Sequence, residues 1–210
     1  MLLPPPETPS LRDLAFAVLD LETTGGMPKG GWNRHDRYLP PSEITEVGVV
    51  FLAGPVLQAR WESLCAIEGP LPQAIQRLTG ITLPMLAGAP SWEHVALELA
   101  PQLEGRIWVA HHAPFDGAFL KVQLPEGLWK RHTLLCTRRL ARVLVPEATS
   151  RSLANLCELL GLHNRRPHRA LPDAEVTADL LQLLIQRAEE QGITSDQFLE
   201  SGRVGWEKLN

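Results

Sequence analysis

Two carboxylates, Asp20 and Glu22, end an apolar run near the start of the chain. This run, over residues 16–21, and the Thr-Thr-Gly-Gly turn that follows predict a buried strand. Residues two apart on a strand share a face, so both acids would lie on the side of Phe16 and Val18. Like charges on such a face repel each other and resist desolvation unless a cation lies between them. Alternatively, the strand ends before Asp20 and both acids are solvated.

Two further acids lie at the start of expected helices. Asp116 follows Phe115 and lies beside the face that its helix would bury, and Asp173 follows Pro172 in the first turn of another helix. Compensation of the helix dipole explains either acid as well. His168 lies in the loop before Asp173, where a histidine is commonly a solvated surface residue. Each of these residues, taken singly, leaves its function open.

The common position of these residues changes that interpretation. Strand ends and helix starts meet at one edge of an α/β sheet, so the four acids converge there and His168 can face the same pocket. Convergent carboxylate oxygens are the ligands that hard divalent cations such as Mg²⁺ and Mn²⁺ require. The sequence therefore predicts a divalent-metal site formed by Asp20, Glu22, Asp116 and Asp173.

The elements that position these residues form two groups. Residues 16–21, 44–52 and 56–67 predict an antiparallel meander of three strands, with Gly54-Pro55 as one turn. Short strands near 107–110 and 134–135 then alternate with helices. The expected helices cover residues 73–78, 92–103, about 114 onward, 138–144, 152–160 and 172–190. This order predicts an α/β fold in which a mixed five-stranded sheet is flanked by helices.

Between the first two strands lies a long connection, residues 27–42, which is rich in glycine and proline. Long connections in compact domains are usually functional or disordered. The segment carries two aromatic residues that could stack on bases, three basic residues and one acid: Trp32, Tyr38, Lys29, Arg34, Arg37 and Asp36. A solvated connection with no further role is the alternative.

The composition limits the classes of protein that fit. The 210 residues include 44% hydrophobic and 21% charged residues, with a net charge of −4 and a mean hydropathy of −0.06. These values exclude a disordered chain, a membrane protein and a basic protein that coats nucleic acid. Three cysteines without a CxxC pair give neither a disulfide framework nor a zinc ribbon. With no signal peptide visible, we expect a cytoplasmic protein.

Three ordered motifs resemble one known family. They are Asp20-Leu-Glu22-Thr-Thr-Gly25, the segment from His111 to Leu120 that contains Asp116, and His168-Arg-Ala-Leu-Pro-Asp173. The chain is similar through these motifs to the DEDDh (DnaQ-like) 3′–5′ exonucleases, which include the proofreading epsilon subunit of bacterial DNA polymerase III. The resemblance extends over residues 16–190 and includes Ile44-Thr-Glu-Val-Gly-Val-Val and Leu78-Thr-Gly-Ile-Thr between the motifs.

The resemblance implies a ribonuclease H-like fold and a phosphodiesterase that uses two divalent metal ions, Mg²⁺ or Mn²⁺. It implies that Asp20, Glu22 and Asp173 hold the metal that binds the attacking water, that Asp20 bridges to the second metal, and that Asp116 supports the second metal through water. His168 is then the general base, because an imidazole titrates near neutrality. Two cations about 3.5–4 Å apart can stabilise both oxygens of an in-line displacement.

Substrate contacts are a further expectation. The resemblance and the basic residues that flank His168 suggest contacts from Leu21, Thr23, Thr79, His112, Arg165, Arg166 and Arg169. His112 stands where many relatives have asparagine, and a packing role is favoured over a metal role for the pair His111 and His112. The three arginines could equally belong to an ordinary solvated surface.

Function follows from this resemblance at several levels. We expect an enzyme that releases nucleoside 5′-monophosphates from DNA 3′ ends, with single-stranded or frayed ends favoured, in proofreading or repair. The alternatives are an exoribonuclease, a short-oligonucleotide nuclease, or a non-catalytic polymerase-associated subunit. Expected partners are nucleic acid 3′ ends, with DNA polymerase III or a sliding clamp as further candidates and Gln197-Phe-Leu as a faint docking motif, but no membrane. The expected organisation is a flexible segment 1–13, an exonuclease domain 14–192 and a tail 193–210.

Overall fold

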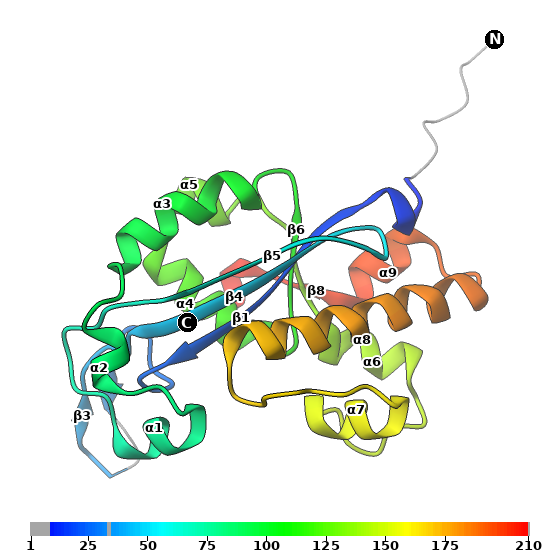
Figure 1. Cartoon of the computed structure of the whole chain (residues 1–210). Helices are drawn as coiled ribbons and strands as arrows, with labels where there is room; N and C mark the ends of the chain where they lie inside the picture. The colour runs from blue at the N-terminus through cyan, green and yellow to red at the C-terminus, as the bar shows by residue number, and fades with distance from the viewer. Residues whose placement is uncertain (1–8, 33–34, 210) are drawn as a thin grey trace.

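The computed structural model describes residues 9–32 and 35–209 and contains a central six-stranded sheet (Figure 1). β1 (Ala15–Thr23) pairs antiparallel with β4 (Ile44–Ala53), which pairs antiparallel with β5 (Val56–Leu64). On the other side of β1 lie the parallel strands β6 (Ile107–Ala110) and β7 (Leu134–Cys136), followed by the antiparallel β8 (Arg203–Val204). The strand order is therefore β5-β4-β1-β6-β7-β8.

Helices cover both faces of the sheet. One face packs against α3 (Trp92–Leu103), α4 (Ala113–Gln123) and α5 (Glu126–Trp129). The opposite face packs against α6 (Thr137–Leu144), α7 (Leu153–Leu160), α8 (Ala170–Glu190) and α9 (Ser195–Gly202). Two short helices, α1 (Gln73–Thr79) and α2 (Leu83–Leu86), and the hairpin of β2 (Gly31–Trp32) and β3 (Tyr38–Leu39) lie beyond the sheet, toward the end of β1 where its acids are found. None of the described helices is long and apolar enough to cross a membrane.

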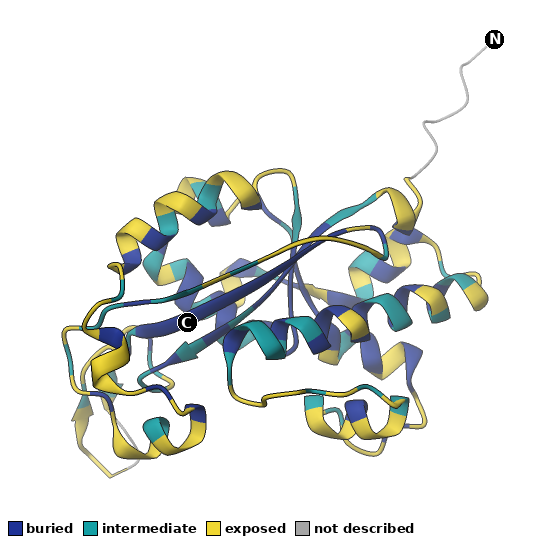
Figure 2. Ribbon diagram, in the orientation of Figure 1, coloured by how far each residue is buried: buried dark blue, intermediate teal, exposed yellow. Residues whose placement is uncertain are grey.

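The apolar pattern of β1 explains why two layers of helices form. Ala17 and Leu19 belong to the core under α3 and α4, whereas Phe16 and Val18 belong to the core under α8. Both faces of β1 and β4 are buried over most of their length (Figure 2). On the α8 face the apolar series ends at Asp20 and continues with Glu22. The change from apolar to acidic residues therefore occurs on one face, toward the start of α8.

A glycine in β4 allows α8 to approach the sheet closely. A Cβ atom on Gly48 would lie 2.3 Å from the backbone nitrogen of Leu171, in the first turn of α8. Side-chain movement cannot relieve a contact with backbone, so only glycine fits at this position. Gly48 pairs with Asp20 in the sheet, and the close approach therefore brings the first turn of α8 over the acidic end of β1.

The predicted fold class is confirmed, with one strand more than expected. β8, which has only two residues, pairs with β7 and extends the sheet from within the segment 193–210 that the sequence assigned to a tail. A two-residue strand shows no alternation that a sequence pattern could reveal. Leu11 and Phe198, which lie outside the expected domain 14–192, are both buried in the core under α8. The domain boundaries themselves stay a prediction.

Candidate active site

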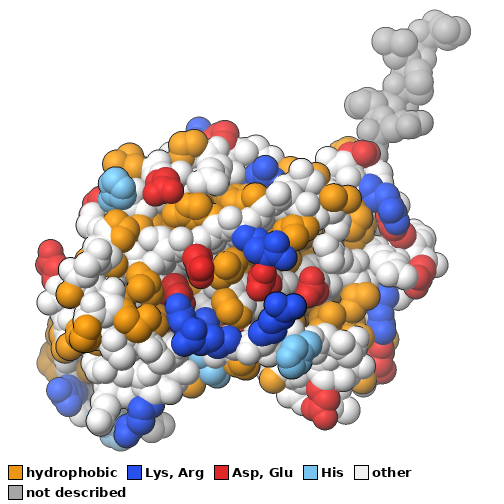
Figure 3. Space-filling view, viewed as in Figure 1, with side chains coloured by type: hydrophobic (Ala, Val, Ile, Leu, Met, Phe, Trp, Pro, Cys, Tyr) orange, Lys and Arg blue, Asp and Glu red, His pale blue; other side chains and the backbone are white. Residues whose placement is uncertain are grey.

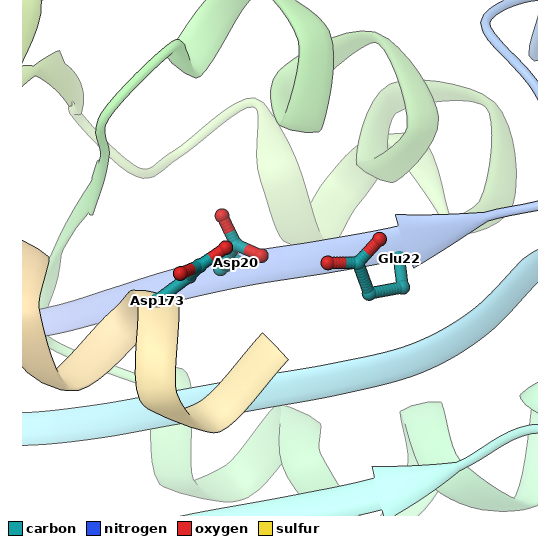
Figure 4. Close-up of side chains that lie close together, drawn as sticks. All are labelled: Asp20, Glu22 and Asp173. Carbon is teal, nitrogen blue, oxygen red and sulfur yellow. The ribbon is translucent and has the colours of Figure 1, made fainter. Parts of the chain in front are cut away.

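Asp20, Glu22 and Asp173 come together at the end of β1. Each offers one carboxylate oxygen, and these oxygens all lie within 4.8 Å of one another. β1 supplies the first two residues, and the first turn of α8 supplies the third (Figure 4). The three carboxylates lie close together where the start of α8 passes over β1. Three carboxylate oxygens arranged in this way can serve as ligands of one divalent cation.

Asp116 joins this group from the opposite side of β1. It lies in the first turn of α4, is buried, and its Oδ1 accepts a hydrogen bond from the backbone nitrogen of Leu21 at 3.2 Å. Leu21 is itself buried, so its link to the site runs through its backbone. The charge of Asp116 raises the pKa of both Asp20 and Glu22. The structure therefore brings together all four acids that the sequence singled out.

The electrostatics of the four acids favour a positive charge among them. Burial is the largest cause in each case: it raises the pKa of Glu22 to about 8 and that of Asp116 to about 7. The pKa of Asp20 is raised well above its usual range by burial and then by the charges of Asp116, Asp173 and Glu22. Burial also raises the pKa of Asp173. An all-oxygen donor set that resists ionisation on its own fits a hard divalent cation.

Asp173 also organises the loop that carries His168. Its Oδ2 accepts a hydrogen bond from the backbone nitrogen of His168 at 3.1 Å, and its Oδ1 accepts one from Nδ2 of Asn164. His168 is exposed and has a φ of +62°, in the left-handed region that favours glycine. Such a conformation costs of order 1–3 kcal/mol and persists only where the surroundings impose it. The loop therefore holds the His168 backbone against Asp173 at a conformational cost, and the charge of His168 acts to lower the pKa of Asp173.

One residue near the site was missed by the sequence analysis as a site residue. Glu46, opposite Glu22 in the sheet, is almost completely buried and forms an ion pair with Arg169. The available signal was an acid within the otherwise apolar strand 44–52, which demands a buried partner. Arg169, predicted to bind substrate, is thus engaged with Glu46.

The other predicted substrate residues occupy varied positions. The hydroxyl of Thr23 donates to the carbonyl of Gly25 at 2.6 Å, and that of Thr79 donates to the carbonyl of Ile75 at 2.9 Å. Arg165 lines a cavity of about 410 Å³ beside α8 and β5, and Arg166 lies near Gly80 at the end of α1. Among the described residues, neither threonine hydroxyl forms a hydrogen bond with one of the four acids.

The two adjacent histidines differ in environment. His111 is buried, with Nδ1 3.0 Å from the hydroxyl of Thr137 and Nε2 3.0 Å from the carbonyl of Arg151. Burial lowers the pKa of His111 to about 4, which suits a packing role. His112 is exposed just before α4, and partial burial and the charge of Arg138 lower its pKa.

The connection 27–42 forms the β2–β3 hairpin on the described residues, and Arg34 lies outside them. Trp32 and Tyr38 face each other across the hairpin with ring centroids 5.9 Å apart, and are 72% and 53% exposed. Met27 anchors its base, because the carbonyl of Met27 accepts from the nitrogen of Ser42 at 2.8 Å. Two aromatic rings are therefore presented to solvent beyond the acidic end of β1.

Comparison with known proteins identifies the family. The model of the exonuclease family RNase_T matches residues 17–181, which include all four acids and His168. The chain belongs to this exonuclease family. Members of this family need divalent metal ions for activity. The cluster of Asp20, Glu22 and Asp173 could bind such an ion. The resemblance to DEDDh exonucleases is thereby confirmed.

Individual relatives of this exonuclease domain fall into two groups by length. The DNA polymerase III subunit epsilon of Aquifex aeolicus is 31% identical over 179 residues, covering 84% of this chain and 83% of that protein. A "Putative bifunctional exonuclease/endonuclease protein" of Mycobacterium tuberculosis is 37% identical over 201 residues, which are 94% of this chain but 30% of that protein. The chain thus spans less than a third of the length of several relatives.

Among solved structures, Exonuclease X in complex with 5′ overhanging duplex DNA superimposes with a TM-score of 0.65 and 26% identity. The match covers 89% of this chain and 98% of that one.

Proposed function

We propose that this exonuclease domain is a 3′–5′ exonuclease that removes nucleoside 5′-monophosphates from the 3′ ends of DNA, with single-stranded or frayed ends as its substrate. The proposal rests on the convergence of Asp20, Glu22 and Asp173, which each place one carboxylate oxygen within 4.8 Å of the others. Asp116 lies next to them and accepts a hydrogen bond from the backbone nitrogen of Leu21. Their elements, β1, α8 and α4, come from the whole length of the family match.

The four acids have two parts in the proposed reaction. Asp20, Glu22 and Asp173 would hold one divalent ion, Asp20 would also face a second, and Asp116 would support that second ion. Bound Mg²⁺ or Mn²⁺ would stabilise negative charge on the entering and leaving oxygens of the phosphodiester. His168 would accept the proton of the attacking water, and Asp173 fixes its loop through the hydrogen bond to the His168 backbone. The water oxygen would bond to phosphorus as the bond from phosphorus to the 3′ oxygen of the preceding nucleotide breaks. That oxygen would take up a proton, and the 3′-terminal nucleotide would leave as its 5′-monophosphate.

The names of several relatives support DNA as the proposed substrate. Exonuclease X is bound to DNA, and relatives at 30% identity or more include polymerase III proteins and the 3′-5′ exonuclease DinG of Bacillus subtilis. The same names support a role in proofreading or repair. A non-catalytic role would leave four clustered acids, of which Asp116 is buried and the other three are half-buried, without a purpose at a cost in stability.

A sliding-clamp peptide does not form part of the proposal. Phe198, the central residue of Gln197-Phe-Leu, is fully buried in the core under α8. A segment used as a docking peptide must expose its aromatic side chain. Association with a polymerase rests on the names of relatives alone.

The test is degradation of four 3′-labelled substrates side by side, with Mg²⁺, Mn²⁺ or chelator. We expect single-stranded DNA and mismatched duplex to be shortened from the 3′ end faster than paired duplex, with RNA slowest and no reaction in chelator. Faster degradation of RNA than of DNA would assign the domain to the exoribonuclease alternative. No degradation of any substrate with either metal would contradict the proposed function itself.

A further inference from the structure

The first turn of α8 is joined to β4 by a buried ion pair. Glu46 is 2% exposed and the Arg169 side chain 14%. Nε of Arg169 donates to Oε1 and Oε2 of Glu46 at 3.0 and 2.9 Å, and its Nη2 also donates to Oε1. The backbone nitrogen of Ala170, the first residue of α8, donates to Oε2 at 2.9 Å. One strand carboxylate therefore binds both the guanidinium before the helix and the first amide of the helix.

This carboxylate replaces a local helix cap. The N-cap position of α8 is Arg169, whose side chain makes no capping hydrogen bond. The first amides of a helix need acceptors and favour negative charge nearby. Glu46 meets both needs from a different element, so β4 rather than the preceding loop sets where α8 begins.

The same part of β4 lies directly beside the metal-site residues of β1. Glu46 pairs with Glu22, and Gly48 pairs with Asp20. Gly48 permits the close approach of Leu171, while Glu46 holds Ala170, so both contacts act on the first turn of α8. Asp173 lies in that turn. A displacement of the turn would therefore change the distance between Asp173 and the two carboxylates of β1.

The charge of the pair also matters to the site. Glu46 raises the pKa of Asp20, Glu22 and Asp173, and Arg169 lowers that of Glu22. A buried ion pair that loses one partner leaves an uncompensated charge, whereas replacement of both partners is often nearly neutral. Loss of Arg169 alone would add a fifth unpaired carboxylate to the group.

We propose that Glu46 and Arg169 are positioning residues of the metal site, which set the distance between the β1 carboxylates and Asp173. Arg169 acts by holding Glu46 and the start of α8, in place of the phosphate contact that the sequence suggested. The inference rests on the proposed metal-dependent function of this site. It gives the arginine between His168 and α8 a role that the three motifs do not assign.

The sign of one effect separates positioning from charge. Arg169→Met removes a positive charge near a cation site, so a purely electrostatic role would make Mn²⁺ bind more tightly. A positioning role has the opposite effect, because misplaced ligands bind metal less well. Residues that orient metal ligands typically contribute roughly 10–100-fold to metal affinity or activity. We therefore expect Arg169→Met to weaken Mn²⁺ binding by that factor.

The experiment measures Mn²⁺ affinity by calorimetry, together with kcat, KM and salt dependence on single-stranded DNA, using the full chain. Arg169→Met should lower kcat and Mn²⁺ affinity and leave KM unchanged. Adding Glu46→Gln should restore most of the loss, since the amide oxygen still accepts from Ala170 and the pair is again neutral. Arg169→Lys should be intermediate, because an ammonium lacks the two-point contact of Nε and Nη2.

A second ion pair between the sheet and α8 offers a matched control. Arg60 of β5 forms an exposed ion pair with Glu175 of α8, with Nε 2.5 Å from Oε1. Figure 3 shows such basic and acidic side chains close together on the face crossed by α8. Arg60→Met also breaks a link between the sheet and α8, but outside the first turn, and should leave Mn²⁺ affinity and kcat unchanged.

Two outcomes would overturn the proposal. Unchanged or tighter Mn²⁺ binding by Arg169→Met, with a raised KM that the double variant retains, would make Arg169 a substrate contact. Losses of kcat and Mn²⁺ affinity in Arg60→Met as large as those in Arg169→Met would show that the ion pair of Glu46 and Arg169 only supports α8 in general. Should Arg169→Met fail to fold, Arg169→Lys and the double variant carry the same comparison. If the wild-type chain bound no Mn²⁺ and degraded no substrate, the proposed function itself would be contradicted, rather than the positioning role alone.

Discussion

The two segments that flank the acidic end of β1 are held in place very differently. The start of α8 is fixed by the ion pair of Glu46 and Arg169 and by the backbone contact at Gly48. The β2–β3 hairpin has two paired rungs, and the rings of Trp32 and Tyr38 contact each other while remaining exposed. The first segment buries charge at a cost in desolvation, and the second exposes apolar surface.

This difference suggests a division of labour. Metal ligands and a general base must keep their positions within about half an ångström, which requires a rigid support. Contacts to a flexible single strand tolerate movement, and exposed aromatic rings accept any base. Changes at the α8 segment should therefore act on turnover by large factors, and changes at the hairpin should act on affinity by small ones.

The largest expected effect is on the ligands themselves. Asp20→Asn or Asp173→Asn should reduce hydrolysis to background, because the metal site loses an oxygen anion. Thermal unfolding of the metal-free variants should occur at higher temperature than that of the wild type, since each variant removes a carboxylate whose ionised form is disfavoured by desolvation and by neighbouring acids. Exonuclease assays and calorimetry in chelator check the two parts. Wild-type activity of either variant would contradict the metal-site assignment.

His168 should give the next largest effect. His168→Ala should lower kcat by roughly 10²–10⁴-fold, the usual contribution of positioned proton transfer, with Mn²⁺ affinity nearly unchanged. The acidic limb of the pH–rate profile should change as well. His168→Asn is the matched control, because asparagine tolerates the left-handed conformation and is not a base. Equal rates in His168→Asn and the wild type would show that another group activates the water.

The stability of the metal-free protein should depend on pH in an unusual direction. Glu22, whose pKa is raised from 4.5 to about 8, binds a proton in the folded state at pH values where the unfolded chain has lost it. Its contribution to stability is therefore present below about pH 4.5 and is lost as the pH rises to about 8, by an amount on the order of a few kcal/mol. Denaturant unfolding in chelator should show this loss.

Divalent metal should reverse that trend. Metal ligands must be deprotonated, so Mg²⁺ affinity and the stabilisation by Mg²⁺ should rise over the same pH range. Glu22→Gln should flatten the pH dependence in chelator, whereas Trp32→Ala in the hairpin should leave it unchanged. An increase in metal-free stability toward pH 8 would contradict the account of the acidic cluster.

Sequence patterns predicted the acids of the site and several of the elements that carry them, but not the ion pair that holds the start of α8. Helix α3 and strand β6 have the predicted bounds, because Ser91 caps the helix and four consecutive apolar residues form the strand. The four acids were found because carboxylates beside apolar runs are costly. The partnership of Glu46 with Arg169 joins residues 123 positions apart, which no local periodicity reveals. The short elements β2, β3, β8, α2 and α5 are also missing from the sequence prediction, because two to four residues without an apolar run show no periodicity.

The smallest expected effect belongs to the hairpin, and it tests the other half of the comparison. If Trp32 or Tyr38 stacks on a base, its replacement by alanine should cost about 1–3 kcal/mol in binding of single-stranded DNA, with little sequence preference. Replacing Lys29 and Arg37 by glutamine should flatten the salt dependence by up to about 0.7 for each phosphate that is no longer neutralised. The value of kcat at saturating substrate should survive, because the acids and His168 are untouched. Leu97→Ala on α3, where the leucine is 76% exposed, is the control for removal of exposed apolar surface, and should leave affinity unchanged. Trp32→Ala with wild-type affinity, and an unchanged salt slope in the double glutamine variant, would make the hairpin a solvated connection and leave Arg165 and Arg166 as the better candidates for holding the strand.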